Sequence, residues 1–306
     1  MKRKIAVGVD FSPESELAAR QALEIARRTG AEVALVHAQL VVELPAVGPE
    51  PEALVQAALD GQRTRLAREL EESRERLADL RVRLSGQGPE VSQALVEGVA
   101  DESLGTAASE LDAELLVVGT HGRTGLRWFF LGSVAQHAVR LSPIDVLVAR
   151  RDGAGRGGFK SVLAAIDFSP SSIRALDRAL ELVAPDGRVD VVHFHPRWPL
   201  GAWSEAAMAY DMRLDLAVQA ELRKRGESLL AARRREGGPE LALHLIGEPP
   251  APGIIHLLET RMFDLAVLGS HGRRGFRRAV LGSVAEAIVR RAPCSVLVAR
   301  SPEPER

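Results

Sequence analysis

The chain carries one long sequence pattern twice, and this duplication limits its fold more than any other feature. Residues 119–150 (GTHGRTGLRWFFLGSVAQHAVRLSPIDVLVAR) align without a gap to residues 269–300 (GSHGRRGFRRAVLGSVAEAIVRRAPCSVLVAR), and 19 of these 32 positions are identical. A second pair lies upstream, where IAVGVDFSPES from Ile5 matches VLAAIDFSPSS from Val162. The repeat is about half of the 306 residues, far longer than a solenoid unit, so we predict a duplicated domain.

The junction between the two copies is rich in glycine. Residues 152–158, DGAGRGG, have no hydrophobic periodicity and predict a flexible linker. We therefore place the first domain at 1–151 and the second at 159–300. Residues 301–306, SPEPER, contain two prolines and no apolar side chain, which predicts a frayed tail.

Each half alternates short apolar runs with amphipathic segments. Continuous apolar strands that alternate with helices predict an α/β fold, a doubly wound parallel sheet of five strands covered on both faces. Ligands of such sheets bind beyond the carboxyl ends of the strands, where the strand order reverses. The predicted strands are Ile5–Val9, Glu32–Ala38, Val91–Val96, Leu115–Val118 and Val146–Ala149, then Val162–Ile166, Val189–Phe194, Leu241–Ile246, Leu265–Leu268 and Val296–Ala299. The predicted helices include one opened by Ser12 and Pro13, a long charged segment near 52–84, Ala100–Leu111, and Ser133–Arg140.

Composition excludes several classes of protein. A hydrophobic content of 46% with 26% charged residues is typical of a soluble globular protein, and a formal charge of −1 gives no electrostatic reason to expect nucleic acid or a membrane as partner. The single Cys294 excludes an intrachain disulfide and fits a reducing compartment. The apolar stretch near the N-terminus ends at Asp10, too short for a signal peptide, and no run reaches the about 20 residues of a membrane span. We expect a cytoplasmic protein.

The glycine pattern of the repeat predicts a phosphate-binding loop. Gly119-x-x-Gly122 follows a predicted strand and precedes Gly132-Ser133 by nine residues, and the second half has the same spacing. Glycines there would allow positive φ and a nest of backbone amides, and Gly132-Ser133-Val134 opens a helix whose N-terminus favours an anion. Ser133 is interpreted as either the helix cap or a phosphate donor. One Gly-x-x-Gly is equally typical of a tight capping turn, but the full pattern in both halves favours the loop. The second copy comprises Gly269, Gly272, Gly282, Ser283 and Val284, and the arginines within the loops are Arg123 and Arg273.

Polar residues at other strand ends are further candidates. Asp10 and Asp167 end the first strand of each half, where a carboxylate could accept hydrogen bonds from a base or a sugar; a turn-forming role is the compatible alternative. His121 and His271 lie inside the loops, but no second histidine stands at a metal-ligand spacing. The second strands end near Ala38 and Phe194, whose backbone could meet an adenine or simply pack at the edge.

These residues carry a resemblance to a known family. The Val-Asp-Phe-Ser and Ile-Asp-Phe-Ser starts, the Val-His pair ending the second strand, the Gly-x-x-Gly, nine residues, Gly-Ser loop and the closing Pro-x-x-Val-Leu-Val segment resemble a tandem universal stress protein over nearly all of both halves. The resemblance implies two Rossmann-like, adenine nucleotide alpha hydrolase-like domains that bind ATP, with Mg²⁺ as an optional companion. It also implies pairing of Val146–Ala149 with Val296–Ala299 as an intramolecular pseudo-dimer, and it leaves open a further homodimer and unidentified protein partners.

The resemblance also implies which residues surround the nucleotide. In the second half, Ala165 replaces Gly8 and the bulky Phe194 replaces Ala38, which predicts a tighter or weaker second pocket. The set implied for the first half is Gly8, Asp10, Ala38, Gly119, Thr120, His121, Gly122, Arg123, Thr124, Gly125, Gly132, Ser133 and Val134. For the second half it is Ala165, Asp167, Phe194, Gly269, Ser270, His271, Gly272, Arg273, Arg274, Gly275, Gly282, Ser283 and Val284.

Three functions are compatible with these features. The first is an ATP-binding regulator of stress physiology that acts through partners, because the sequence lacks the P-loop, the His-Glu-x-x-His motif and the serine nucleophile elbow. The second is a slow ATPase that uses Asp10 or His121 near the phosphates. The third is an interaction scaffold that uses the charged helices near 52–84 and 205–236. We favour the first.

Overall fold

The computed structural model describes residues 3–39, 53–86, 88–120, 131–150, 158–195, 205–272 and 281–300. The chain divides into two compact units. The first is built from Met1–Leu126 and Gly132–Ile144, and the second contains Asp145–Arg306. The strand that ends the first sequence repeat is therefore part of the second unit. Most of the predicted linker, 152–157, and the predicted tail, 301–306, lie outside the described residues.

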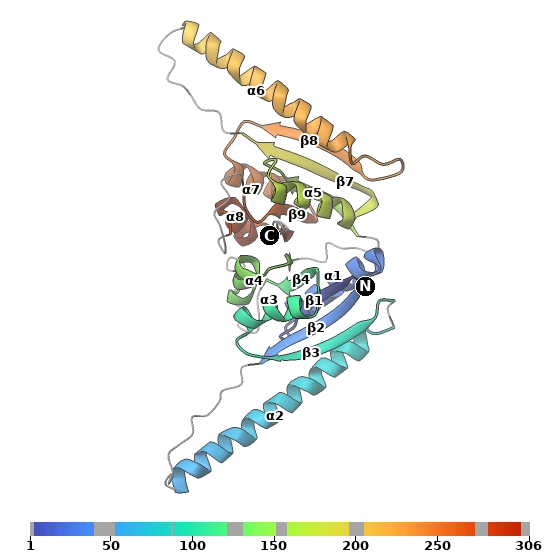
Figure 1. Cartoon of the computed structure of the whole chain (residues 1–306), viewed down its shortest axis with the longest axis vertical. Coiled ribbons are helices and arrows are strands. Elements are labelled where there is room, and N and C mark those ends of the chain that lie inside the picture. The colour runs from blue at the N-terminus through green and yellow to red at the C-terminus, as the bar shows by residue number, and fades with distance from the viewer. Residues whose placement is uncertain are drawn as a thin grey trace, which may run out of the picture. The chain divides into compact units, whose positions relative to one another are not determined.

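The first unit is a parallel sheet with helices on both faces (Figure 1). Its strand order is β3-β2-β1-β4, and every pair is parallel. Helices α1 and α2 pack on one face, while α3 and α4 pack together on the other. The elements are β1 (Lys4–Gly8), α1 (Pro13–Thr29), β2 (Glu32–Gln39), α2 (Ala53–Leu84), β3 (Val91–Glu97), α3 (Ala100–Glu110), β4 (Leu115–Gly119) and α4 (Ser133–Leu141).

The second unit repeats this arrangement and has two further strands, β10 and β5 (Figure 1). Its parallel order is β10-β9-β6-β7-β8, and β5 pairs with β10 in the antiparallel sense. The elements are β5 (Asp145–Ala149), β6 (Phe159–Ala165), α5 (Pro170–Leu182), β7 (Val183–Phe194), α6 (Glu205–Ala231), β8 (Glu240–Ile246), α7 (Pro250–Thr260), β9 (Leu265–Gly269), α8 (Ser283–Arg291) and β10 (Ser295–Ala299). The predicted α/β class and parallel sheets are confirmed.

The local sequence explains where the elements begin. Ser12 and Ser169 cap α1 and α5 by accepting hydrogen bonds from the amides of Ser15 and Ser172, and proline occupies the first turn of both helices. The central strands are almost completely buried, as their continuous apolar runs predicted. The sequence did not predict that β7 begins at Val183, where a register shift in its pairing with β6 admits extra residues.

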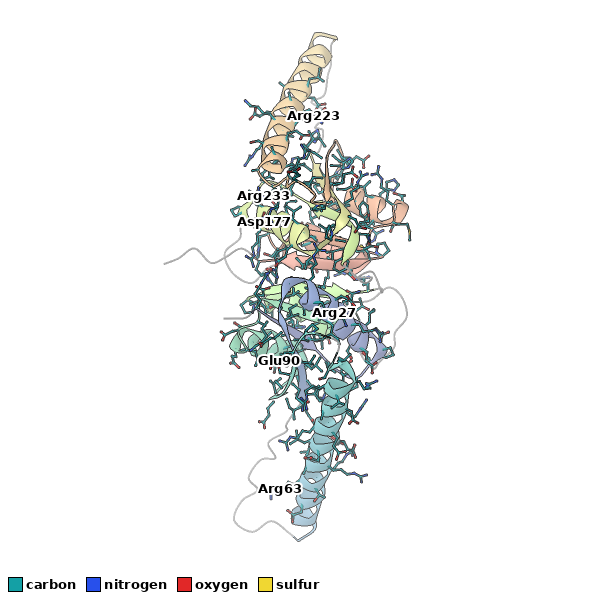
Figure 2. The ribbon with its side chains drawn as sticks, turned by 90° about the vertical axis from the view of Figure 1, so that its right-hand side faces the viewer. Arg27, Arg63, Glu90, Asp177, Arg223 and Arg233 are labelled. Carbon is teal, nitrogen blue, oxygen red and sulfur yellow. The ribbon has the colours of Figure 1, made fainter. Side chains whose placement is uncertain are left out.

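The two long helices differ from the others because they bury little of their length. Leu77, Leu80 and Leu84 are buried at the C-terminal end of α2, whereas its described middle part is mostly exposed. Figure 2 shows charged side chains along both helices, including Arg63 on α2 and Arg223 on α6. No helix in the described part of the chain is long and apolar enough to cross a membrane.

Candidate functional site

The predicted site residues follow the strands that flank the reversal of strand order in each unit. In the first unit β1 lies beside β4, and in the second β6 lies beside β9. Asp10 and Asp167 come after β1 and β6, while Gly119 and Gly269 end β4 and β9. Both candidate sets therefore lie at the carboxyl ends of neighbouring parallel strands, which is where doubly wound sheets bind ligands.

Each aspartate forms a tight turn that starts a helix. Oδ1 of Asp10 accepts hydrogen bonds from the Ser12 amide at 3.0 Å and the Ser12 hydroxyl at 2.5 Å. Oδ1 of Asp167 accepts one from the Ser169 amide at 3.0 Å. The turn-forming role of both residues is confirmed, and their role in ligand binding stays a prediction.

A left-handed phenylalanine follows each aspartate, and it belongs to a cluster that sequence reasoning missed. Phe11 has φ 64°, a conformation that non-glycine residues rarely adopt. Its ring lies 4.7 Å from the His37 ring, and the Arg76 guanidinium lies 4.2 Å above it. Nδ1 of His37 donates to the Val9 carbonyl at 2.6 Å, since a carbonyl can only accept.

The second unit contains the same cluster. Phe168 has φ 63°, its ring lies 4.9 Å from that of His193, and Arg225 lies 4.5 Å above it. His193 donates to the Ile166 carbonyl at 2.8 Å. The repeated Asp-Phe-Ser and Val-His pairs were the available signal, but nothing in the charged helices α2 and α6 indicated which arginine would reach the ring.

In the second unit the aspartate and the glycine loop come together. A side chain at Gly272 would place its Cβ 2.8 Å from Oδ2 of Asp167, so this carboxylate lies directly beside the loop. The Ser171 hydroxyl donates to the backbone carbonyl of His271 at 2.5 Å and fixes the loop where it leaves β9. The His271 ring contacts the Ser270 hydroxyl through Nδ1 at 3.0 Å. Four residues of the candidate set, Asp167, Ser270, His271 and Gly272, therefore lie together in one group.

The positive φ predicted for the first glycine of each loop is wrong. Neither Gly119 nor Gly269 has positive φ. At Gly119 a Cβ would lie 2.9 Å from the backbone carbon of Glu14, and at Gly269 it would lie 2.8 Å from the amide nitrogen of Ser172. Because these positions have no side chain, the first turn of α1 packs closely against the end of β4, and the first turn of α5 packs closely against the end of β9.

The starts of α4 and α8 are only partly available to a ligand. Gly132 and Gly282 are the N-cap residues, neither has a side-chain cap, and their own amides donate to the carbonyls of Thr120 and Ser270 at 2.8 Å. The capping role proposed for Ser133 is therefore wrong. Ser133 and Ser283 are exposed, and the amides of a first helical turn have no partner within their helix. Val134 and Val284 follow in the same turns.

The predicted differences between the two sites have a packing explanation. The space that a Cβ would take at Gly8 is filled by Leu104, 3.0 Å away, whereas Ala165 has room for its methyl group in the second unit. The Phe194 ring is buried against Gly253 of α7, where an added Cβ would lie only 2.1 Å from it. Phe194 therefore fills space under α7. Ala38, at the matching place on β2, is half-buried.

Part of the candidate set lies outside the described residues: His121, Gly122, Arg123, Thr124 and Gly125 in the first half, and Arg273, Arg274 and Gly275 in the second. The described ranges contain no group of three or more His, Cys, Asp or Glu side chains that could hold a metal ion.

The fold and the site define a class of protein: a duplicated, doubly wound α/β protein with an aspartate turn and a glycine loop in each half. The model of the universal stress protein family matches residues 1–150 and 158–300, so the chain belongs to this family. It is 30% identical over 302 residues to a universal stress protein of Mycolicibacterium smegmatis, which covers 97% of this chain and 96% of that protein. A universal stress protein of Mycobacterium tuberculosis is 29% identical over 228 residues, 72% of this chain and 68% of that protein. The crystal structure of a universal stress protein from Archaeoglobus fulgidus has a TM-score of 0.66 at 19% identity and covers 98% of both chains, which shows the shared fold.

Proposed function

We propose that each half of this stress protein binds ATP and that the chain works as a nucleotide-dependent regulatory module. The observation that carries the proposal is the group formed by Asp167, Gly272 and the start of α8. The carboxylate adjoins the loop at Gly272, and Gly282 is held to the end of β9 through the Ser270 carbonyl. A carboxylate that can accept from a sugar or base then lies near a helix N-terminus that favours phosphate.

The same logic supports ATP binding in the first half. Asp10 forms the same turn, Gly132 donates to the Thr120 carbonyl as Gly282 does to that of Ser270, and Ser133 is exposed like Ser283. Oδ1 of Asp10 accepts two hydrogen bonds from Ser12, which supports a role for this carboxylate in holding the turn. A regulator that senses nucleotide occupancy is the more economical proposal.

The stoichiometry of ATP binding tests the proposal. Nucleotide released from the purified chain is identified by mass spectrometry, and the emptied protein is titrated with ATP in Mg²⁺ and in EDTA. We expect two sites. Gly272→Val should remove one site, because the added side chain would meet the Asp167 carboxylate. Gly122 matches Gly272 in the first repeat, so Gly122→Val should remove the other site and the double variant both. Asp177→Asn on the exposed surface of α5 is the control and should keep two.

Unchanged stoichiometry in the folded double variant would show that the loops do not hold the nucleotide. Phosphate release measured in the same samples tests the hydrolase alternative. Turnover that disappears in Asp10→Ala while ATP binding persists would favour an enzyme over a regulator.

A further inference from the structure

The antiparallel pairing of β5 with β10 involves two strands of almost the same sequence. β5 reads DVLVA and β10 reads SVLVA. Val146 lies opposite Val298, Leu147 opposite Leu297 and Val148 opposite Val296. In the same register, β5 could pair with the β5 of a second copy and present the same valines and leucine. The backbone hydrogen bonds and apolar side chains of β5 therefore fit β10 and the β5 of another chain equally well.

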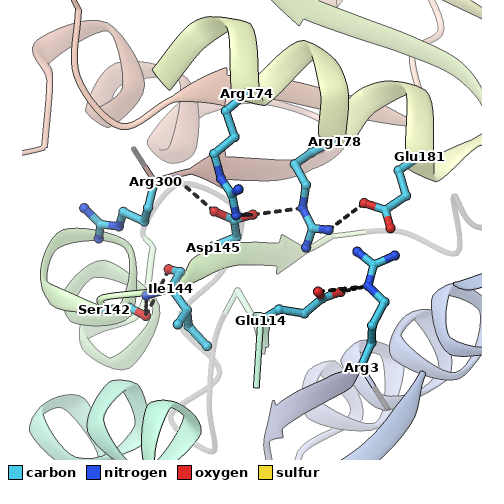
Figure 3. Close-up of polar contacts among 9 residues, drawn as sticks. All are labelled: Arg3, Glu114, Ser142, Ile144, Asp145, Arg174, Arg178, Glu181 and Arg300. Carbon is cyan, nitrogen blue, oxygen red and sulfur yellow. Dashed lines mark hydrogen bonds and ion pairs between the residues drawn. The ribbon is translucent and has the colours of Figure 1, made fainter. Parts of the chain in front are cut away.

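The one position at which the two strands differ carries a buried charge. Asp145 is completely buried. Its Oδ2 forms ion pairs with Arg174 Nη2 at 3.1 Å and Arg178 Nε at 2.8 Å, and both arginines reach it from α5 (Figure 3). Its Oδ1 accepts a hydrogen bond from the Arg300 amide at 2.8 Å. We call Asp145, Arg174 and Arg178 the Asp145 cluster.

The repeat alignment places neutral residues at every matching position of the other half. Ser295 matches Asp145, and its hydroxyl accepts a hydrogen bond from the Arg150 amide at 3.1 Å, the counterpart of the bond from Arg300. In α1, Leu17 matches Arg174 and Gln21 matches Arg178, counted from the Ser-Pro that begins both helices. The set Asp145, Arg174 and Arg178 is therefore charged, and the matching set Ser295, Leu17 and Gln21 is neutral.

We propose that the Asp145 cluster selects the partner of β5: this strand fits the face made by α5 and β10 of the second repeat and rejects the β5 of another copy. In a pair of two β5 strands, Asp145 would lose Arg174 and Arg178; the residues that match these arginines in the first repeat, Leu17 and Gln21, are neutral, so each Asp145 would be a buried carboxylate without a cation. In the complementary pair of two β10 strands, Arg174 and Arg178 would face Ser295 and lose their ion pairs with Asp145, although Arg178 would keep its pair with Glu181. Burial of the unpaired Asp145 carboxylate strongly opposes the first arrangement, and the loss of two ion pairs disfavours the second.

Exchange of the cluster for the residues of the first repeat tests this proposal. The triple variant Asp145→Ser, Arg174→Leu, Arg178→Gln leaves no fully buried charge unpaired in either arrangement, and Glu181, which loses its ion pair with Arg178, is partly exposed, so we expect it to fold. It should nevertheless associate between chains, because nothing then disfavours the pairing of like strands. Sedimentation velocity over a wide concentration range should show the association constant rising by about a hundredfold or more relative to the native chain.

A double variant on the same helix provides the matched control. Asp177 of α5 pairs with Arg233 at 2.6 Å, but Asp177 is half exposed (Figure 2). Asp177→Asn with Arg233→Gln removes the same kinds of charge away from β5, and its association constant should equal that of the native chain. A folded triple variant that associates no more than this control would overturn the proposal.

Hydrogen exchange keeps the proposal falsifiable if the triple variant does not fold. Arg174→Leu alone removes one partly exposed guanidinium of the cluster. The amides of residues 146–149 should then exchange about tenfold faster or more, while those of β9 keep the native rate. If the β5 amides exchange as slowly as in the Asp177 and Arg233 control, the cluster does not hold this strand and the proposal fails.

Discussion

Replacement of Gly253 by serine should destabilise the second unit because the Phe194 ring occupies the space of the new side chain. The Cβ would lie 2.1 Å from Cε1 of Phe194, whereas carbon atoms in contact are ordinarily about 3.5–4.0 Å apart. The ring is buried, so either it leaves its rotamer or α7 moves away from β7. Overpacking of this kind costs about 1–3 kcal/mol, and the better helix propensity of serine offsets about 0.5 kcal/mol. We expect a net loss of about 2 kcal/mol.

The first unit indicates which second substitution should relieve the strain. The residues at the matching positions are Ala38 and Ser103, small on the strand and larger on the helix, the reverse of Phe194 and Gly253. Phe194→Ala alone should cost about 3–4 kcal/mol through the cavity it leaves. In Phe194→Ala with Gly253→Ser the clash is absent and the serine fills part of the cavity, so the double variant should cost about 3 kcal/mol. The coupling energy is then about −2 to −3 kcal/mol.

The assay must report on the second unit alone, because two compact units can unfold separately. Hydrogen exchange of the amides in β7 and α7, followed over a urea series, gives the local free energy of opening for each variant. Gly61→Ser in α2 is the control: nothing lies within 4 Å of its added Cβ, so it should not destabilise. A Gly253→Ser protein as stable as the native one, or a coupling energy within about 0.5 kcal/mol of zero, would refute the packing of Phe194 against Gly253.

Two further predictions concern single contacts. Gly269→Ala should destabilise the second unit by about 1–3 kcal/mol, because its Cβ would meet backbone atoms of Ser171 and Ser172 that cannot turn aside; thermal unfolding measures the loss. A hydrogen bond from Lys160 is the main cause that lowers the pKa of Asp186. A carboxyl group with a lowered folded pKa contributes stability above its unfolded pKa that is lost as the pH falls through the folded pKa. Lys160→Met should therefore raise the pKa of Asp186 in an NMR titration and weaken the acid dependence of stability; an unshifted titration would contradict this.

The sequence predicted the fold well because the relevant signals are local. Apolar runs such as Leu115–Val118 are buried as parallel strands, and Ser-Pro pairs begin α1 and α5. Element ends were missed where they depend on another strand, as at Val183, which pairs with Phe159 across a register shift. The pairing of Val146–Ala149 with Val296–Ala299 was implied by the family resemblance and is observed between β5 and β10, whereas the arginines that surround Asp145 were not predicted.

The sequence indicated which residue types lie at the candidate site, but not the contacts that each of them makes. Turn formation, the compatible alternative for Asp10, is observed, while the ligand role that was favoured for this residue stays a prediction. The glycine at position 119 was expected to adopt positive φ, but its function depends on how closely α1 approaches β4, which no local pattern encodes. Arg76 could not be identified because it is one of many arginines on a charged helix, and only the folded chain brings it over the Phe11 ring.

The two halves differ in some groups of contacting residues and share others unchanged. Where one member of a contacting group changed, its neighbours changed with it, both in the Phe194–Gly253 pair and in the Asp145 cluster. The aspartate turn, its left-handed phenylalanine and the histidine behind it are instead kept in both halves, although a non-glycine residue in that conformation is strained. The rings of Phe11 and Phe168 also pack against His37 and His193 in the two halves. The strained turn is therefore kept together with its ring contacts beside the reversal of strand order in each unit, at the place where the nucleotide is proposed to bind.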